Sequence, residues 1–296
     1  MDAAEIVPGT AAAPGVIPGE VSVKAADTVL AVTRIAWRGD AAATGTRLVP
    51  TETPIALTYN RATHAVMLAT PGDLEDFAVG FSLSEGIIDS AADILGLEIV
   101  TVPDGIELRM DLATDRLNAL TRRQRRMAGP SGCGLCGLDS LAAAVRTMPR
   151  VPKGPGLTPA MIHAAMQSMP AAQTLNVATR AVHAAAFWTP AHGLVALRED
   201  VGRHNALDKL AGALARRSIA AADGIVLLSS RVSVEMVQKA ATMGASVIVA
   251  VSAPTSLAIR QADAANLTLI GVARPDGFEV FTHPDRVCPE TVPHVA

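Results

Sequence analysis

The chain has 296 residues, half of them hydrophobic, and a formal net charge of −3 at pH 7. It is long enough for one large domain or two modest ones, and it has no general attraction to nucleic acid or to anionic membranes. Three cysteines are too few for a disulfide framework, and this favours a reducing, cytoplasmic compartment. No signal peptide is evident, and no apolar run reaches the roughly 18–20 residues that span a bilayer.

The N-terminal part is expected to be a tail followed by strands. Residues 1–27 are rich in Ala, Pro and Gly without periodicity, which is typical of disorder. From Val29 the pattern alternates as in a strand, most clearly over 105–112, and a turn joins this segment to 97–102. We therefore expect a β-rich N-terminal domain over 28–130.

One helix is expected within this β-rich domain. Asp73 is a suitable N-cap residue for it. Four apolar residues that follow share one helical face: Leu74, Phe77, Ala78 and Phe81.

Two cysteines, Cys133 and Cys136, lie in the glycine-flanked run 131–137, directly after the basic stretch 122–126. Nearby positive charge favours the thiolate, which is the form that attacks sulfur or binds metal. The start of a predicted helix over 138–145 would favour it further. We expect a mobile Cys-x-x-Cys loop and helix over 131–157, with sulfurs that are accessible and reactive.

A Cys-x-x-Cys pair has several uses, and the residues alone leave them open. Half of a zinc site would need two more ligands, and the remaining Cys288 and the histidines 183, 192 and 204 show no tidy spacing. A thioredoxin-like pair should follow a strand, and this one follows Arg-rich sequence. Sulfur handling and a pair of ordinary loop cysteines are the other two interpretations.

The second half of the chain predicts an α/β domain over 158–284, followed by a tail over 285–296. Thr158 is a helix cap with Pro159 at the first helical position. Strands and helices then alternate: strand 225–228, helix 233–243, strand 247–251, helix 255–265 and strand 267–272. Because the strands are unbroken apolar runs, we expect a sheet covered by helices on both faces.

Polar segments follow several of these elements. Asp200, His204 and Asp208 recur at four-residue steps, and spacing alone favours a solvated helix face with local ion pairs. His183 stands alone in an apolar stretch, where a histidine is usually satisfied and partly buried. The segments 229–233 and 252–256 each follow a strand and open a helix, the position at which open α/β sheets bind ligands. Simple helix capping is the alternative for both.

Together these segments resemble the formate dehydrogenase accessory sulfurtransferase family, from about residue 54 to residue 284. The matching segments are 69–73, 80–81, 84–88, 133–137, 183–186, 199–210, 229–239, 252–257 and 281–284.

The resemblance implies a cytidine-deaminase-like three-layer α/β domain without catalytic zinc, plus a smaller β-rich N-terminal domain. It implies a sulfur carrier that takes sulfur from a cysteine desulfurase as a persulfide on Cys133, with Cys136 assisting. The sulfur then goes to the guanine-dinucleotide form of the molybdenum cofactor, which is required for formate dehydrogenase activity. The cofactor is a bound substrate here, with no permanent cofactor or metal, and a homodimer is implied.

The cofactor-binding segment of the family corresponds here to Val272, Ala273, Arg274, Pro275, Asp276 and Gly277. Arg274 is suited to pair with phosphate. The chain departs from the family's sequence pattern at two places that concern ligand binding. Thr179-Arg180-Ala181 replaces the family's Thr-Gly-Gly, and the cofactor segment lacks its usual aromatic start and basic end. The alternative function is a non-enzymatic molybdenum-cofactor-binding chaperone with a structural metal at the cysteines.

Overall fold

The structure, a computed structural model, describes residues 28–116 and 148–288. The strands of the N-terminal part are β1 Val29–Arg38, β2 Ala41–Pro50, β3 Thr53–Tyr59, β4 Ala62–Ala69, β5 Ile94–Val102 and β6 Gly105–Leu112. Those of the C-terminal part are β7 His183–Thr189, β8 Gly193–Asp200, β9 Ile225–Leu228, β10 Val247–Ala250, β11 Thr268–Arg274 and β12 Gly277–Val280. The helices are α1 Leu74–Ser84, α4 Pro159–Ala172, α5 Thr174–Thr179, α6 Arg203–Arg216, α7 Val234–Thr242 and α8 Ser256–Ala264. The cysteine pair and the helix predicted over 138–145 lie outside the described residues.

The first sheet has four strands in the order β4-β3-β6-β5. The predicted hairpin is confirmed as β5 and β6, which pair antiparallel, while β3 and β6 run parallel. Alternate residues of β6 are buried (Ile106, Leu108, Met110 and Leu112), as the two-residue period predicted. Helix α1 covers this face, and its apolar side chains complete one hydrophobic core.

Helix α1 begins where it was predicted, but Asp73 does not cap it through its side chain. Asp73 adopts a left-handed backbone conformation with φ 54° and makes no side-chain cap bond. Its carboxylate instead lies 3.4 Å from the guanidinium of Arg198, far along the chain. An ion pair to another part of the protein has therefore replaced the local hydrogen bond that the sequence predicted.

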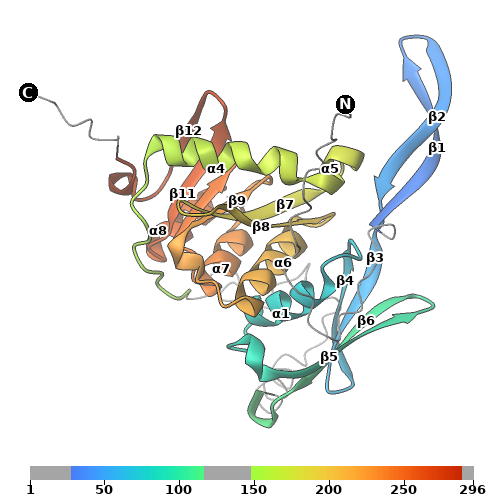
Figure 1. The fold of residues 1–296 in the computed structure, drawn as a ribbon, viewed down its shortest axis with the longest axis horizontal. Helices are drawn as coiled ribbons and strands as arrows, with labels where there is room; N and C mark the ends of the chain where they lie inside the picture. The colour runs from blue at the N-terminus through green and yellow to red at the C-terminus, as the bar shows by residue number, and fades with distance from the viewer. Residues whose placement is uncertain (1–27, 117–147, 289–296) are drawn as a thin grey trace, which may run out of the picture.

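The hairpin β1–β2 forms a sheet of its own. It projects from the rest of the chain as a long two-stranded ribbon, seen in blue in Figure 1. Its base is closed by a hydrogen bond from the backbone N–H of Thr51 to the carbonyl of Thr28.

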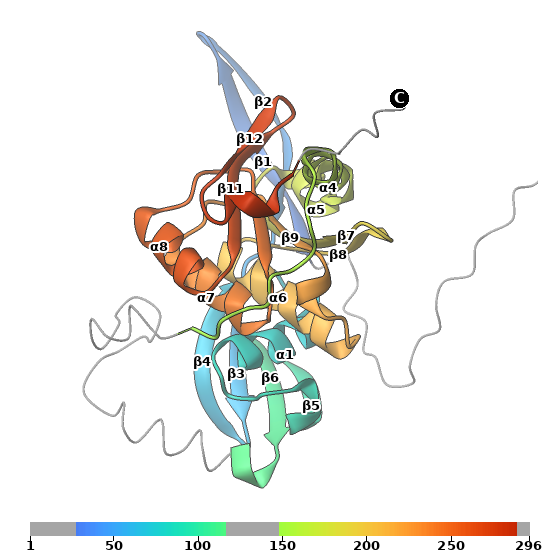
Figure 2. The ribbon, with the colours of Figure 1, turned by 90° about the vertical axis from the view of Figure 1, so that its left-hand side faces the viewer.

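The second sheet has six strands in the order β12-β11-β10-β9-β7-β8. Strands β9, β10 and β11 are parallel, as their uninterrupted apolar sequences predicted. Residues of α6, α7 and α8 pack on one face of this sheet and residues of α4 on the other, which gives two separate hydrophobic cores. Figure 2 shows these layers edge-on, and the predicted three-layer α/β arrangement is confirmed.

The predicted helices and strands of this part agree with the structure to within about two residues. Thr158 caps α4, since its hydroxyl accepts a hydrogen bond from the N–H of Met161 at 3.2 Å. Strands β7, β8 and β12 and helix α5 had no individual prediction. Strand β12 and helix α5 are short, and the four residues of β12 carry only partly buried side chains or exposed ones, so their pattern is weak. The domain limit at 130 lies within residues 117–147, outside the described part of the chain, and the predicted division into domains stays a prediction.

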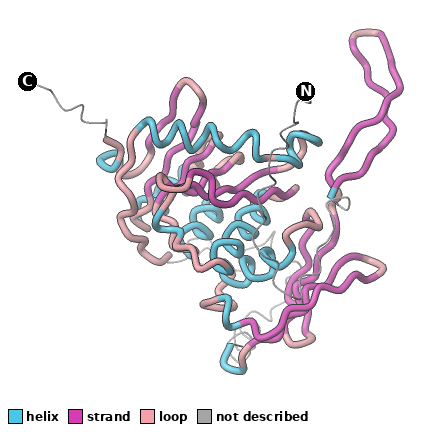
Figure 3. Tube along the Cα trace, viewed as in Figure 1, coloured by secondary structure: helices cyan, strands magenta, loops and turns pink. Residues whose placement is uncertain are grey.

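Helices α1 and α6 join the two parts of the chain. A Cβ atom on Gly80 would lie 1.7 Å from the carbonyl oxygen of Asp208, and one on Gly212 would lie 1.9 Å from that of Asp76. The two helices therefore cross at a pair of glycines, each of which allows the backbone of the other helix to approach. Figure 3 shows this helical contact between the two sheets. Among the described residues, no helix combines the length and apolarity needed to cross a bilayer.

Candidate functional site

The carboxyl ends of four strands meet at one edge of the six-stranded sheet. Strand β7 is antiparallel to both β8 and β9, so β8 runs in the same direction as β9, β10 and β11. Open α/β sheets bind ligands at this edge. The segments 229–233 and 252–256, each predicted to follow a strand, therefore lie along one continuous edge, which we call the strand-end edge.

Three helices begin at the strand-end edge. Helices α6, α7 and α8 start directly after β8, β9 and β10, and the loops before α7 and α8 lie side by side. The N–H of Val232 donates to the carbonyl of Ala253, and the N–H of Thr255 donates to that of Val232. Thr255 also caps α8 through its hydroxyl, so simple capping holds for this one of the two polar segments. The first-turn N–H groups of three helices favour an anion at this edge.

Asp200 ends β8 and is completely buried, so the solvated helix face expected from spacing is wrong. Its carboxylate lies 2.7 Å from Nζ of Lys209. It also accepts hydrogen bonds from the N–H groups of Thr70 and Gly202 and from the side-chain amide of Asn205, at 2.8–3.0 Å. Asp200 lies just before α6. Its hydrogen bond from Thr70 therefore ties the start of this helix to the N-terminal part.

Asp208 is buried as well, and it pairs with a residue of the next helix. Nζ of Lys239 lies 2.9 Å from both carboxylate oxygens, and Ser84 donates to one of them at 2.6 Å. Burial raises the pKa of Asp208, with Lys239 pulling against it. Burial works to lower the pKa of Lys239, but the charges of Asp208 and Glu85 outweigh it and leave that pKa raised. The bidentate contact favours the ionised pair.

His204 lies one turn before Asp208, in the first turn of α6. Burial and the positive charges of Arg203 and Lys239 lower the pKa of His204 to about 4, so the ring is neutral at pH 7. Its Nε2 and the Nε of Arg203 are buried, and neither has a hydrogen-bond partner in the described part of the chain. Two unpartnered polar atoms at the strand-end edge are suited to a polar or anionic ligand.

His183 begins β7 and lies opposite Asp200 in the register of the two strands. Burial, followed by the charge of Arg203, lowers the pKa of His183, against the effect of Asp200. The next residue is tied to β9, because the N–H of Ala184 donates to the hydroxyl of Ser229 at 2.8 Å. His183 is partly buried, as predicted. Within residues 28–116 and 148–288, no three His, Cys, Asp or Glu side chains gather as a candidate metal site.

The predicted cofactor segment spans the end of β11, the turn and the start of β12. Arg274 pairs with Gly277, and Arg274, Pro275 and Asp276 are exposed, whereas Ala273 is buried. The segment is therefore a hairpin turn at the strand-end edge rather than a loop that follows the last strand. Four strand spacings separate β11 from β8, about 19 Å in all. An edge of this width suits an extended molecule better than a small one.

Val272 has a backbone conformation that is rare for a β-branched residue. Its φ is 51°, in the left-handed region, and the pairing of β11 with β12 shifts register next to it. The backbone is held there by a hydrogen bond from the N–H of Val272 to the carbonyl of Ser252. Such conformations cluster at functional sites, and the sequence had no signal for this one because valine ordinarily favours an extended strand.

Two further acidic side chains, Glu199 and Asp76, have structural roles. Glu199 accepts hydrogen bonds from the first-turn N–H groups of α5, from Leu175 at 2.8 Å and Asn176 at 2.7 Å. Asp76 of α1 binds Arg198 and Arg216, each at 2.6 Å. Sequence analysis missed Asp76, because nothing in the chain near it signals the two cations that it meets.

Cys133 and Cys136 lie outside the described residues, so the structure does not place the predicted persulfide site. The third cysteine, Cys288, is exposed and free. Its N–H donates to the carbonyl of Leu157 at 2.9 Å, so it lies beside the start of α4.

Comparison with known proteins gives a consistent result. Residues 50–288 match the FdhD/NarQ family. The chain is 51% identical over 261 residues to the sulfur carrier protein FdhD of Agrobacterium fabrum, covering 86% of this chain and 95% of the relative. It is 49% identical over 248 residues to the protein of the same name from Bordetella petrii, covering 83% and 88%.

A crystal structure from Desulfotalea psychrophila, described as a candidate formate dehydrogenase accessory protein, has a similar fold. Its TM-score is 0.70 at 24% sequence identity, and the alignment covers 88% of this chain and all of that one. At this level of identity the likeness shows the fold alone.

Proposed function

Because this chain belongs to the FdhD/NarQ family, we propose that it takes sulfur from a cysteine desulfurase and delivers it to the molybdenum cofactor needed by formate dehydrogenase. The observation that carries the proposal is the match over residues 50–288, which includes the Cys133–Cys136 pair, to relatives that are sulfur carrier proteins. The proposed compartment is the cytoplasm, and the proposed active form is a homodimer.

The proposed chemistry starts on Cys133. Its thiolate attacks the sulfane sulfur of the desulfurase persulfide, a new sulfur–sulfur bond forms on Cys133, and the desulfurase thiolate leaves. Four arginines at 122, 123, 125 and 126 and the flanking glycines favour an ionised, accessible sulfur. Cys136 is proposed to assist the transfer. No metal is needed for this step.

The proposed acceptor, the guanine-dinucleotide form of the cofactor, would bind as substrate along the strand-end edge. Exposed Arg274 offers a cation for phosphate, and α6, α7 and α8 begin at this edge, with the positive ends of their dipoles toward it. The unpartnered Nε of Arg203 and Nε2 of His204 are two more polar atoms for such a ligand. Val272 to Gly277 would hold one end of it.

Mass spectrometry of the full chain after incubation with a cysteine desulfurase and cysteine tests the proposal. We expect an adduct of about 32 Da, one sulfur atom, on Cys133. Cys133→Ala should lose the adduct and all activation of formate dehydrogenase, whereas Cys288→Ala should keep both. Unchanged activation with Cys133→Ala would refute the relay. Stoichiometric zinc without an adduct would favour the cofactor-binding chaperone.

A further inference from the structure

The β1–β2 hairpin has one face that carries no charge and whose side chains are all exposed. Opposed residues of an antiparallel pair point to the same side, so the register defines this face. We call it the outer face, and its residues are Ala31, Thr33, Ile35, Trp37, Ala42, Thr44, Thr46 and Leu48. All eight are exposed, and the exposed fractions of Ile35 and Trp37 are 64% and 69%.

The opposite face is basic and turns toward the rest of the molecule. It carries Arg34, Arg38 and Arg47, and neither strand contains an acidic residue. Arg47 donates to the carbonyl of Thr179 at the end of α5, at 3.1 Å. This bond sets the orientation of the hairpin near its base, with the arginines toward α5 and the outer face away from it.

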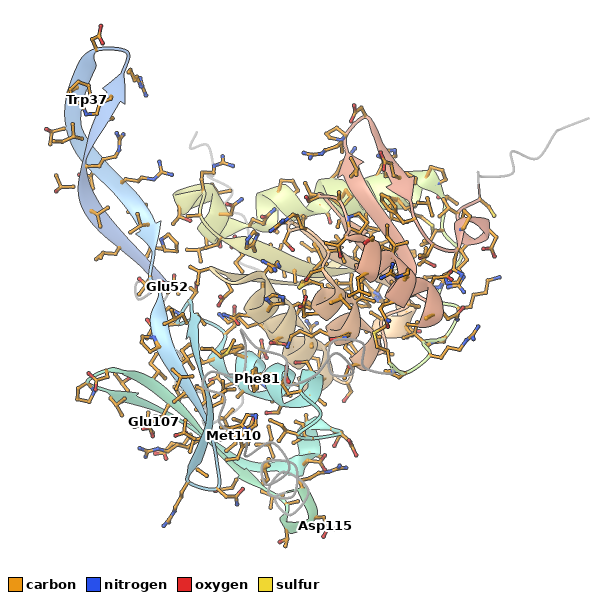
Figure 4. The ribbon with its side chains drawn as sticks, turned by 180° about the vertical axis from the view of Figure 1, so that it is seen from behind. Trp37, Glu52, Phe81, Glu107, Met110 and Asp115 are labelled. Atoms are coloured by element: carbon orange, nitrogen blue, oxygen red, sulfur yellow. The ribbon has the colours of Figure 1, made fainter. Side chains whose placement is uncertain are left out.

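A free hairpin with this sequence is not a stable arrangement. An isolated two-stranded ribbon is marginal in water, and a long apolar ribbon with two unpaired edges invites pairing with another chain. Figure 4 shows Trp37 near the free end of the hairpin, far from the hydrophobic cores. The ribbon therefore needs a partner that covers the outer face.

We propose that the outer face docks a second copy of this chain, with the two hairpins packed across a two-fold axis. At such an axis the same patch lies on both sides, and residues near the axis face their own equivalents, which uncharged Ala, Thr, Ile, Leu and Trp tolerate and arginines do not. A face without charge also has no means of selecting a differently charged protein. The inference rests on the homodimer of the proposed function and assigns its contact.

The size of the hairpin shows how far this contact must extend. Ten residues span about 34 Å, and a ribbon about 10 Å wide buries roughly 700 Å² when two copies stack. Stable specific interfaces bury at least about 1,200 Å². The hairpins therefore form the centre of the contact, and the remainder comes from the two bodies. Because the base of the hairpin lies beside α5, the second copy is carried close to His183 and the strand-end edge.

Sedimentation of the full chain over a range of concentrations tests the docking. The wild type should form dimers, and Ile35→Glu with Trp37→Glu should weaken dimerisation at least 100-fold. The matched control, Arg34→Glu with Arg38→Glu, alters the basic face of the same hairpin and should leave the dimer intact. Unchanged thermal unfolding of both variants would show that neither affects the cores.

Three results would overturn the docking proposal: a monomeric wild type, a double variant that dimerises like the wild type, or equal losses in the variant and the control. If the wild type is monomeric and the outer-face variant still loses formate dehydrogenase activation, the face binds a different protein. Sulfur transfer is tested separately, because the monomeric variant should still gain the adduct on Cys133. A dimer that gains no adduct would refute the relay and leave the docking proposal standing.

Discussion

Nζ of Lys209 lies 2.7 Å from Oδ2 of Asp200, and neither side chain has any exposed area. Nζ also donates to the carbonyl of Thr70 at 2.8 Å, so the pair joins the end of β8, helix α6 and the N-terminal part. A buried pair of this kind contributes little compared with an apolar replacement of both partners, but removal of one partner leaves an uncompensated charge.

Lys209→Met is therefore expected to lower the free energy of unfolding by about 3–5 kcal/mol, measured by urea denaturation. Arg109→Met is the control, since Arg109 pairs with Glu107 and Glu98 on the exposed surface of β6 and β5. The control should lose about 1 kcal/mol or less. Equal losses in the two variants would mean that burial of the Asp200 pair has no energetic consequence.

Gly80→Ala is expected to disrupt the crossing of α1 and α6. The new Cβ would lie 1.7 Å from the carbonyl oxygen of Asp208, and backbone on both sides would have to move. Overpacking of this kind costs about 1–3 kcal/mol, occasionally more. Gly45→Ala, where a Cβ meets nothing within 4 Å, should leave the melting temperature unchanged. A stable Gly80→Ala variant would show that the helices can separate freely.

Val272→Gly tests the strain at the predicted cofactor segment. A left-handed conformation costs a β-branched residue about 1–3 kcal/mol, which glycine does not incur. That relief should offset the lost side-chain burial, so we expect a change in unfolding free energy of less than about 1 kcal/mol. Val280→Gly, on the neighbouring strand without a positive φ, should lose about 1–2 kcal/mol. Equal losses would contradict strain at Val272.

His204 should make the protein less stable in acid. Its pKa is about 4 in the folded chain and near 6.5 when exposed, so as pH falls below 6.5 the unfolded chain takes up a proton that the folded chain does not. Stability is therefore lost between pH 6.5 and 4, by about 2 kcal/mol in all. The ring is only partly buried, and this estimate lies below the full linkage value.

His204→Gln should flatten this part of the pH–stability profile, measured by urea denaturation at each pH. His192→Gln is the control, because His192 is exposed on the β7–β8 turn. Its profile should follow the wild type. A His204→Gln profile as steep as that of the wild type would place the acid sensitivity in other groups, among them His183.

Local pattern in the sequence determined most of the secondary structure, the parallel strands and the reactive-cysteine hypothesis. Unbroken apolar runs predicted β9 and β10, and Thr158-Pro159 predicted the start of α4. These features depend only on residues that are close together in the sequence, which set the spacing of buried side chains and the capping of helices. Tertiary structure alone decided that Asp208 is buried, since its partner Lys239 is 31 positions away. It likewise decided the left-handed Val272 and the placement of His183, Asp200 and Arg274 along one sheet edge. Pairing between distant strands sets those features, and no local spacing encodes it.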